Sequence, residues 1–314
     1  MSLNFTTLDV FTNTAYRGNP LAVVTISPNH QPPITQSQKQ RIAREFNLSE
    51  TVFVHDVENP SEAYERKVDI FTPKWELPFA GHPTIGTAVF LRSQGVKTMV
   101  VKAGRIDIDF DSSGSARALI PHDVRLHEAR LTRPKYEDGA DGHLAEVAAA
   151  EEGARLFSIV NGMTFALIEL PSVEMLSAAK VGAMGLISGD LQDDGWKHDF
   201  DSRRYYFVRL SAEESSDGKR LVQNLRTRLV KYTMEDPATG SAACALACYL
   251  ALYTVSVDSV QFRITQGVEM GRESLIVVDV EIETDEAGAR KVRTVHLGGN
   301  AVEVMSGTIR VPEI

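Results

Sequence analysis

Apolar and polar residues alternate over several short runs, which predicts a chain built mainly from half-buried β-strands. Residues 3–10 and 20–26 show this period of two, with Arg17-Gly18-Asn19 between them as a turn. Residues 37–46 follow a helical period instead, and Asn47 is placed to end that helix. The opening of the chain therefore predicts two strands followed by one helix.

Two longer apolar segments, 79–91 and 236–250, each begin with a glycine-bearing turn and predict apolar helices. Each follows a predicted strand, over 67–71 and 226–230 respectively. Further strands are expected over 50–54, 98–102, 105–110, 164–170, 204–210, 261–265, 274–281, 291–296 and 307–312. Because this order occurs twice without βα alternation, it predicts an α+β fold, rich in antiparallel strands, with one central helix per half.

The 314 residues, 43% of them hydrophobic, suffice for two cores of about 150 residues each. We expect an N-terminal half over 1–125 and a C-terminal half over 126–299, with closing strands near 300–314 packing on the first half. The stretch 135–155 is rich in Glu, Asp, Gly and Ala and predicts a connector with a short helix over 143–150.

Charge and hydropathy exclude several classes of partner. The net charge is -9, from 33 Lys+Arg against 42 Asp+Glu, and no basic block could neutralise phosphates, so nucleic acid is not expected. No apolar run approaches the roughly 20 residues that span a bilayer, and the first residues lack the zones of a signal peptide. The expected protein is soluble and cytoplasmic, without a membrane partner.

The only two cysteines, Cys244 and Cys248, lie four residues apart in an apolar helix and are expected to serve packing. A disulfide framework is therefore not expected. The eight histidines show no metal-ligand spacing, so no protein-held metal is indicated.

Three short segments carry residues suited to chemistry: 47–51, 79–83 and 236–241. In the last two, glycine precedes a helix whose first backbone N–H groups face outward at the positive end of the helix dipole, and such a turn binds anions. Two such turns facing one another across a cleft would hold a carboxylate and stabilise an enolate-like charge. Glu50 is followed by an apolar strand, so burial could raise its pKa toward working pH and suit it to proton transfer.

Each of these residues also has an ordinary structural interpretation. Glu50 could be a surface carboxylate, and the glycine turns could serve only to start a helix. His82 could be a hydrogen-bonded histidine at a helix start rather than a proton-transfer group. Asp236 could cap its helix, and Ser241 could pack in the first turn.

Several motifs resemble the phenazine-biosynthesis PhzF-like family, in the same order and across nearly the whole chain. They are Asp9-Val-Phe-Thr12, Gly18-Asn-Pro-Leu-Ala-Val-Val24, Ser49-Glu-Thr-Val-Phe53, Phe71-Thr-Pro73, Phe79-Ala-Gly-His-Pro-Thr-Ile-Gly86, Asp236-Pro-Ala-Thr-Gly-Ser-Ala242 and Gln266-Gly267. The resemblance implies a diaminopimelate epimerase-like fold: two pseudo-symmetric halves, each a mixed or antiparallel sheet around a central helix, with the active site between them. It also implies a homodimer and no cofactor.

The resemblance assigns roles to individual residues. It places Glu50 on the family's catalytic acid/base and His82, Asp236 and Ser241 on its supporting polar residues. The substrate-binding set that it implies is Asn19, Gly81, Thr239 and Gly240. Related epimerases use two cysteines at the helix-start turns, where this chain has Ala80 and Ala238, so a two-thiol mechanism is disfavoured. Many relatives carry Arg before Phe71-Thr-Pro73, whereas this chain has Val68-Asp69-Ile70.

These features predict a cofactor-independent isomerase that shifts a proton or double bond on a small carboxylate-bearing metabolite. An epimerase or cyclase of a secondary-metabolite intermediate is one alternative. A non-catalytic protein that binds a metabolite or a protein partner is another. A nicotinamide enzyme is disfavoured because no GxGxxG turn lies between an early strand and a helix.

Overall fold

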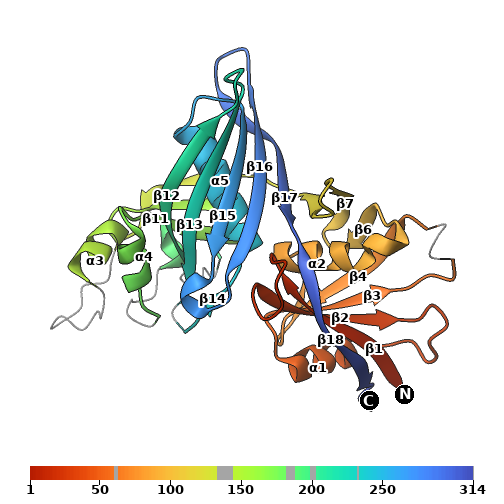
Figure 1. The fold of residues 1–314 in the computed structure, drawn as a ribbon. Helices are drawn as coiled ribbons and strands as arrows, with labels where there is room; N and C mark the ends of the chain where they lie inside the picture. The colour runs from red at the N-terminus through yellow and green to blue at the C-terminus, as the bar shows by residue number, and fades with distance from the viewer. Residues whose placement is uncertain (60–62, 133–143, 182–187, 199–202, 232, 314) are drawn as a thin grey trace. The chain divides into compact units, whose positions relative to one another are not determined.

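The computed structural model describes residues 1–59, 63–132, 144–181, 188–198, 203–231 and 233–313 (Figure 1). The chain forms two compact units, Met1–Leu119 with Leu297–Ile314, and Ile120–His296. The limits expected from the sequence, 1–125 and 126–299, remain predictions of where independently folding halves begin and end. Within the described residues, no helix has the length and apolar character needed to cross a membrane.

The first unit is a mixed sheet with one helix enclosed by it and one outside. Its strand order is β18–β1–β2–β3–β4–β6–β7–β8; the β2/β3 and β4/β6 pairs are parallel and the others antiparallel. The elements are β1 (Ser2–Val10), β2 (Asn19–Ile26), α1 (Gln36–Phe46), β3 (Thr51–His55), β4 (Glu65–Phe71), β5 (Glu76–Leu77), α2 (Gly81–Leu91), η1 (Arg92–Gln94), β6 (Thr98–Val101), β7 (Gly104–Phe110), β8 (Ala116–Leu119) and β18 (Ala301–Arg310). Helix α2 packs against β1, β2, β3, β18 and β8, so strands from both ends of this order enclose it.

The second unit has the same construction. Its strand order is β9–β10–β11–β12–β13–β15–β16, with the β11/β12 and β13/β15 pairs parallel. The elements are β9 (Arg125–Arg130), α3 (Ala145–Glu151), β10 (Arg155–Val160), β11 (Met163–Glu169), α4 (Val173–Ala178), η3 (Gly189–Leu191), β12 (Arg204–Glu214), β13 (Arg220–Val230), β14 (Glu235–Asp236), α5 (Gly240–Tyr253), β15 (Ser259–Gln266), η4 (Val268–Met270), β16 (Ser274–Thr284) and β17 (Arg290–Gly299). The residues of β17 from Leu297 onward belong to unit 1. Helix α5 packs against β10, β11, β15 and β16 (Figure 1). Helix α3 confirms the short helix expected over 143–150, and residues 135–143 of the predicted connector lie outside the described residues.

Strand pairing aligns the two units residue by residue. In unit 1, Phe71 pairs with both Thr51 and Glu76, and in unit 2, Val230 pairs with both Arg204 and Glu235. Strands β3, β4 and β5 therefore correspond to β12, β13 and β14, and the turn into α2 corresponds to the turn into α5. The repeated order predicted from the sequence is confirmed at the level of hydrogen-bonded register.

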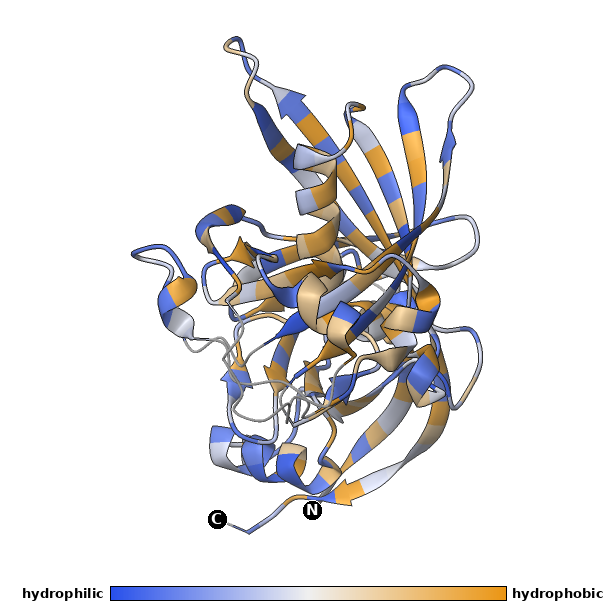
Figure 2. Cartoon of the chain, turned by 90° about the vertical axis from the view of Figure 1, so that its left-hand side faces the viewer, coloured by the Kyte–Doolittle hydropathy of each residue, from blue (hydrophilic) through white to orange (hydrophobic). Residues whose placement is uncertain are grey.

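Local sequence explains the different surroundings of the helices. Helix α1 begins with a capping box between Thr35 and Gln38. It ends at Asn47, as the sequence predicted, with that residue in the left-handed conformation. Helices α2 and α5 are apolar on all sides, which is the pattern of a buried helix. The strands alternate between hydrophilic and hydrophobic residues, as expected for sheets with one face on a core (Figure 2).

A buried charge cluster joins α1 to the sheet of unit 1. The Asp69 carboxylate on β4 accepts hydrogen bonds from Lys39 of α1 and, at 2.7 Å, from His55 of β3. Burial alone would raise the pKa of Asp69, but these two hydrogen bonds outweigh it and lower the pKa to about 2. Asp69 is therefore ionised in the folded protein at all ordinary pH values.

Replacing Asp69 with Asn should lower the free energy of unfolding by about 3–5 kcal/mol, because it leaves the Lys39 ammonium buried without a carboxylate. Urea unfolding at pH 7 measures the loss. The matched control is the double variant Lys39→Met/Asp69→Leu, which removes both charges and should lose much less. Equal losses in the two variants would contradict the assignment of the cost to an uncompensated charge.

The same cluster sets a pH dependence. The folded-state pKa of Asp69, about 2, lies below its ordinary 3.8, so its contribution is complete above about pH 4 and disappears as the pH falls toward 2. Over that window the wild type should lose about 2 kcal/mol that Asp69→Asn does not lose.

Candidate active site

Glu50 and His82 form a close pair in unit 1. Glu50 immediately precedes β3, and His82 is the second residue of α2. The His82 Nδ1 lies 3.2 Å from the Glu50 Oε2, and the side chains are 6% and 18% exposed. A carboxylate that is mostly buried, yet still reached by solvent, and is held by an imidazole can exchange a proton with a bound molecule.

Asn19 lies at the same edge of the unit 1 sheet. It begins β2, which pairs in parallel with β3 so that Ala22 is opposite Thr51, and the side chain of Asn19 is buried. The loop before it holds unusual backbone: Phe11 and Tyr16 both have positive φ, and the Tyr16 N–H donates to the Asp9 carboxylate at 2.6 Å. Strained backbone of this kind is concentrated at functional sites. Asp9 opens the motif Asp9-Val-Phe-Thr12, but its support of this loop is visible only in the structure.

The starts of the two central helices differ from those of the other α-helices. Thr35 and Ser172 cap α1 and α4 through their side chains, whereas Ala80 and Thr239 make no side-chain cap at the starts of α2 and α5. Helix α3 also lacks a side-chain cap but carries an acidic residue in its first turn, and neither α2 nor α5 does. The first N–H groups of α2 and α5 thus keep the anion-binding character of a helix start.

The unit 2 candidates gather in one turn. The Thr239 hydroxyl donates to the Asp236 Oδ2 at 2.6 Å, and Gly240 and Ser241 open α5 directly afterwards. The buried amide of Gln266 donates to the Asp236 carbonyl at 2.8 Å and to the Thr239 hydroxyl at 3.1 Å. The Asp236 carboxylate is therefore bonded within the same turn to the Thr239 hydroxyl.

A second set of contacts holds the same turn at Pro237. The Ser274 hydroxyl donates to the Pro237 carbonyl at 3.1 Å. Gly267 has a φ of +76°, and a Cβ atom at this position would lie 2.5 Å from the Pro237 carbonyl oxygen. Only glycine allows the backbone after β15 to pass this close to the turn.

The register between the units corrects one sequence inference. Because Leu77 pairs with Ile70 as Asp236 pairs with Leu229, Ala80 corresponds to Thr239, not to Ala238. The proposed pairing of Ala80 with Ala238 was wrong by one residue, since it matched the alanines of two turns that differ in sequence. Neither aligned position carries a thiol, so a two-thiol mechanism stays disfavoured.

The two cysteines confirm their predicted packing role. Cys244 and Cys248 are fully buried in α5, and burial raises the pKa of both thiols above the ordinary value. Because the thiolate is the reactive form, both are poor nucleophiles. Within the described residues, no group of three or more His, Cys, Asp or Glu side chains is arranged to hold a metal ion.

Ser158, His127 and Asp193 of unit 2 contact one another in series, but the histidine donates its proton to the serine and so cannot activate it as a nucleophile. His127 Nδ1 accepts from the Asp193 backbone N–H at 3.1 Å, so its Nε2 is the donor to the Ser158 hydroxyl at 2.8 Å. Burial lowers the pKa of His127 and keeps the ring neutral. Ser158 is fully buried and passes its hydrogen bond to Thr164, which donates to Gln192. This is a closed structural network.

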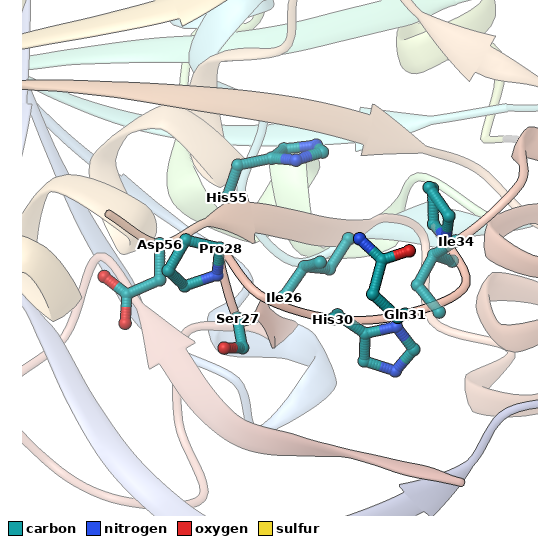
Figure 3. Close-up of a pocket in the computed structure, with 9 residues that line it drawn as sticks. Ile26, Ser27, Pro28, His30, Gln31, Ile34, His55 and Asp56 are labelled. Carbon is teal, nitrogen blue, oxygen red and sulfur yellow. The ribbon is translucent and has the colours of Figure 1, made fainter. Parts of the chain in front are cut away.

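A cavity of about 210 Å³ lies elsewhere in unit 1 (Figure 3). Its walls come from the far ends of β2 and β3 and from the loop before α1, with His30, His55 and Asp56 among the polar residues. Glu50 precedes the first residue of β3, and His55 is the last, so the strand separates them. The cavity is smaller than the roughly 300 Å³ at which ligand sites begin.

Comparisons with known proteins agree over almost the full length. A family model described as phenazine biosynthesis-like protein matches residues 8–307. A trans-2,3-dihydro-3-hydroxyanthranilate isomerase from Pseudomonas fluorescens is 31% identical over 317 residues, covering 98% of this chain and 99% of that protein. A solved phenazine biosynthesis protein of the PhzF family from Bacillus anthracis is 21% identical with a TM-score of 0.66, covering 99% of this chain and 100% of the other.

A solved hydroxyproline epimerase from Agrobacterium vitis has a TM-score of 0.56 at 13% identity, over 98% of this chain and 92% of its own. At such identities the likeness shows the fold alone. Together with the sheet-enclosed helix in each unit, it confirms the predicted fold class, an α+β fold of the diaminopimelate epimerase type.

Gly267→Ala should destabilise the protein through the turn at Pro237. A left-handed φ costs a non-glycine residue about 1–2 kcal/mol, and the contact with the Pro237 carbonyl adds about 1–3 kcal/mol more. The matched control is Gly271→Ala, which has a φ of +69° and open space around the added Cβ. Chemical unfolding of the two variants isolates the contact, and equal losses would show that the close approach has no energetic weight.

Iodoacetamide at pH 8 should leave Cys244 and Cys248 unmodified in the folded protein and alkylate both in urea, because both thiols are buried and their pKa values are raised. Mass spectrometry of the two samples gives the number of alkylated cysteines in each. Alkylation of the folded protein at the rate of a free thiol would contradict the conclusion that both cysteines are buried, poor nucleophiles.

Proposed function

The chain belongs to the phenazine biosynthesis-like family and is an isomerase, and from this premise we propose that it moves a proton on a small carboxylate-bearing metabolite by single-carboxylate acid/base catalysis. The proposal needs no organic cofactor. Its substrate class is a small conjugated carboxylate, by analogy with the Pseudomonas fluorescens relative, which is named for its action on trans-2,3-dihydro-3-hydroxyanthranilate.

The observation that carries the proposal is the Glu50–His82 pair. A lone mostly buried carboxylate would be costly, but His82 at 3.2 Å supplies a hydrogen-bonding partner that also fixes which way the carboxylate faces. In the proposed reaction, Glu50 takes a proton from a carbon conjugated with the substrate's carboxylate. The C–H electron pair enters the conjugated system, and Glu50 returns the proton to another carbon of it.

The helix starts supply the electrostatic part of the proposal. Removing the proton develops negative charge on the substrate, and backbone N–H groups aimed at that charge lower the barrier. We assign this role to Gly81 at the start of α2 and to Gly240 and Ser241 at the start of α5. Thr239, whose N–H donates to Gln266, is assigned to substrate binding as part of the same turn. Asn19 and Asp236 are assigned to hydrogen bonding with the substrate's polar groups.

Two identical acid/base groups are not part of the proposal. The strand register aligns Glu50 with Arg203 and His82 with Ser241, so the second unit has no carboxylate at the equivalent place. A single group that removes and returns a proton suits a double-bond shift better than inversion by two opposed bases.

Replacing Glu50 with Gln should abolish solvent deuterium incorporation into the substrate, by about 10²-fold or more, because the proton carrier is lost while size and burial are kept. The assay offers the enzyme small conjugated carboxylates in D₂O, beginning with trans-2,3-dihydro-3-hydroxyanthranilate, and follows them by NMR. Substrate binding and the unfolding transition should persist.

Glu76→Gln is the matched control for this experiment. Its side chain is also 18% exposed and lies on β5 in the same unit, but it pairs with Lys102 at 3.0 Å and not with a histidine. We expect this variant to exchange deuterium at the wild-type rate. Undiminished exchange in Glu50→Gln would refute the assignment, and binding of the carboxylates without exchange by the wild type would favour a non-catalytic binding protein.

A further inference from the structure

Gln266 is a buried amide with every hydrogen-bonding position in use. Its Nε2 donates to the Asp236 carbonyl at 2.8 Å and to the Thr239 hydroxyl at 3.1 Å. Its Oε1 accepts from the Thr239 backbone N–H at 3.3 Å and from the Tyr205 hydroxyl at 3.1 Å. Two donors and two acceptors complete the capacity of a glutamine side chain, so the amide has only one orientation that satisfies its surroundings.

The Tyr205 hydroxyl fixes this orientation of the Gln266 amide. A hydroxyl has one proton and an amide oxygen only accepts, so Tyr205 donates to Gln266 and accepts from the Thr227 hydroxyl at 3.0 Å. Burial raises the pKa of the Tyr205 hydroxyl and keeps it a neutral donor. Gln266 therefore accepts from Tyr205 and from the Thr239 N–H, and it donates to the Asp236 carbonyl and the Thr239 hydroxyl.

The internal repeat shows that the fold does not require this network. The strand register aligns Gln266 with Val101, Thr239 with Ala80 and Asp236 with Leu77. Unit 1 thus builds the same turn, the same two-residue strand and the same enclosed helix with three apolar residues. A buried polar set that replaces an apolar set of equal topology points to a role other than folding, because unit 1 forms the same turn without these polar groups.

The network also changes what Thr239 does. A threonine before a helix usually accepts a hydrogen bond from an N–H group of the first turn. Thr239 makes no such cap, because its hydroxyl accepts from Gln266 and donates to Asp236. Thr35, the same residue type at the start of α1, does cap its helix.

We propose that Gln266 is a positioning residue, which holds the Thr239 hydroxyl on the Asp236 carboxylate and away from the start of α5. The inference rests on the proposed function, because that function gives Asp236 and the start of α5 a task. By setting the Thr239 hydroxyl, Gln266 orients the Asp236 carboxylate and leaves the first turn of α5 uncapped for the carboxylate of the substrate.

The test is the crystal structure of Gln266→Met, a substitution of similar volume without hydrogen-bonding groups. With Gln266 gone, the Thr239 side chain should rotate so that its oxygen accepts from the first-turn N–H groups of α5. The matched control is Gln223→Met, which removes a buried amide of β13 that donates to the carbonyls of Ser211 and Asn224. In that variant Thr239 should remain on Asp236.

A Thr239 hydroxyl that still donates to Asp236 in Gln266→Met would overturn the proposal. If Gln266→Met does not fold, Gln266→Glu serves the same purpose, because an ionised Glu cannot donate to the Asp236 carbonyl and a protonated one can. Its structure at low and high pH should show Thr239 on Asp236 only at low pH, and no movement between the two would equally overturn the proposal.

The exchange assay adds a readout that a merely structural residue would not move. Gln266→Met should lower deuterium incorporation by about 100-fold through misplacement of the site, while Gln223→Met stays near the wild-type rate. For Gln266→Glu, the rate should fall as the pH rises relative to the wild type. No exchange by the wild type itself would count against the proposed function, whereas the position of Thr239 decides the role of Gln266.

Discussion

Each unit depends on one constraint: a helix that is apolar on every side must be enclosed by the sheet of its own unit. Helices α2 and α5 have no polar face to present to water, so strands from distant places in the sheet order pack around them. Enclosure leaves the ends of such a helix as the places where polar groups can gather. His82 and Ser241 lie in the first turns of the two helices, the part of each buried helix that we propose a ligand reaches.

The duplicated register separates what the fold needs from what the chemistry needs. Positions shared by the units, such as Ile70 with Leu229 and Met99 with Ile264, are apolar in both and form the cores. Several positions that differ in character lie at the turns into α2 and α5, such as Ala80 with Thr239 and Leu77 with Asp236. An enzyme built on two similar halves can therefore keep one architecture while each half acquires its own polar residues.

The sequence predicted the central helices, the termination of α1 at Asn47 and the repeated order of elements, because periodicity and glycine turns are local signals. It missed β10 (Arg155–Val160), which begins at the last residue of the predicted connector. Glu50 could be singled out from its place before an apolar strand, and the structure adds its contact with His82. Gln266 was visible only as part of a motif, because nothing in a strand sequence distinguishes a buried, fully bonded glutamine from an exposed one.

The charges at one pair of equivalent positions have a consequence for how the duplicated chain assembles. Asp69 of β4 meets Lys39, while its counterpart Arg228 of β13 binds Glu235 and the carbonyls at the end of α4. Tandem repeats are prone to exchange matching strands while they fold. If β13 took the place of β4, the Arg228 guanidinium would lie against the buried Lys39 ammonium. The opposite charges at these equivalent positions therefore disfavour the exchange of strands between the two halves.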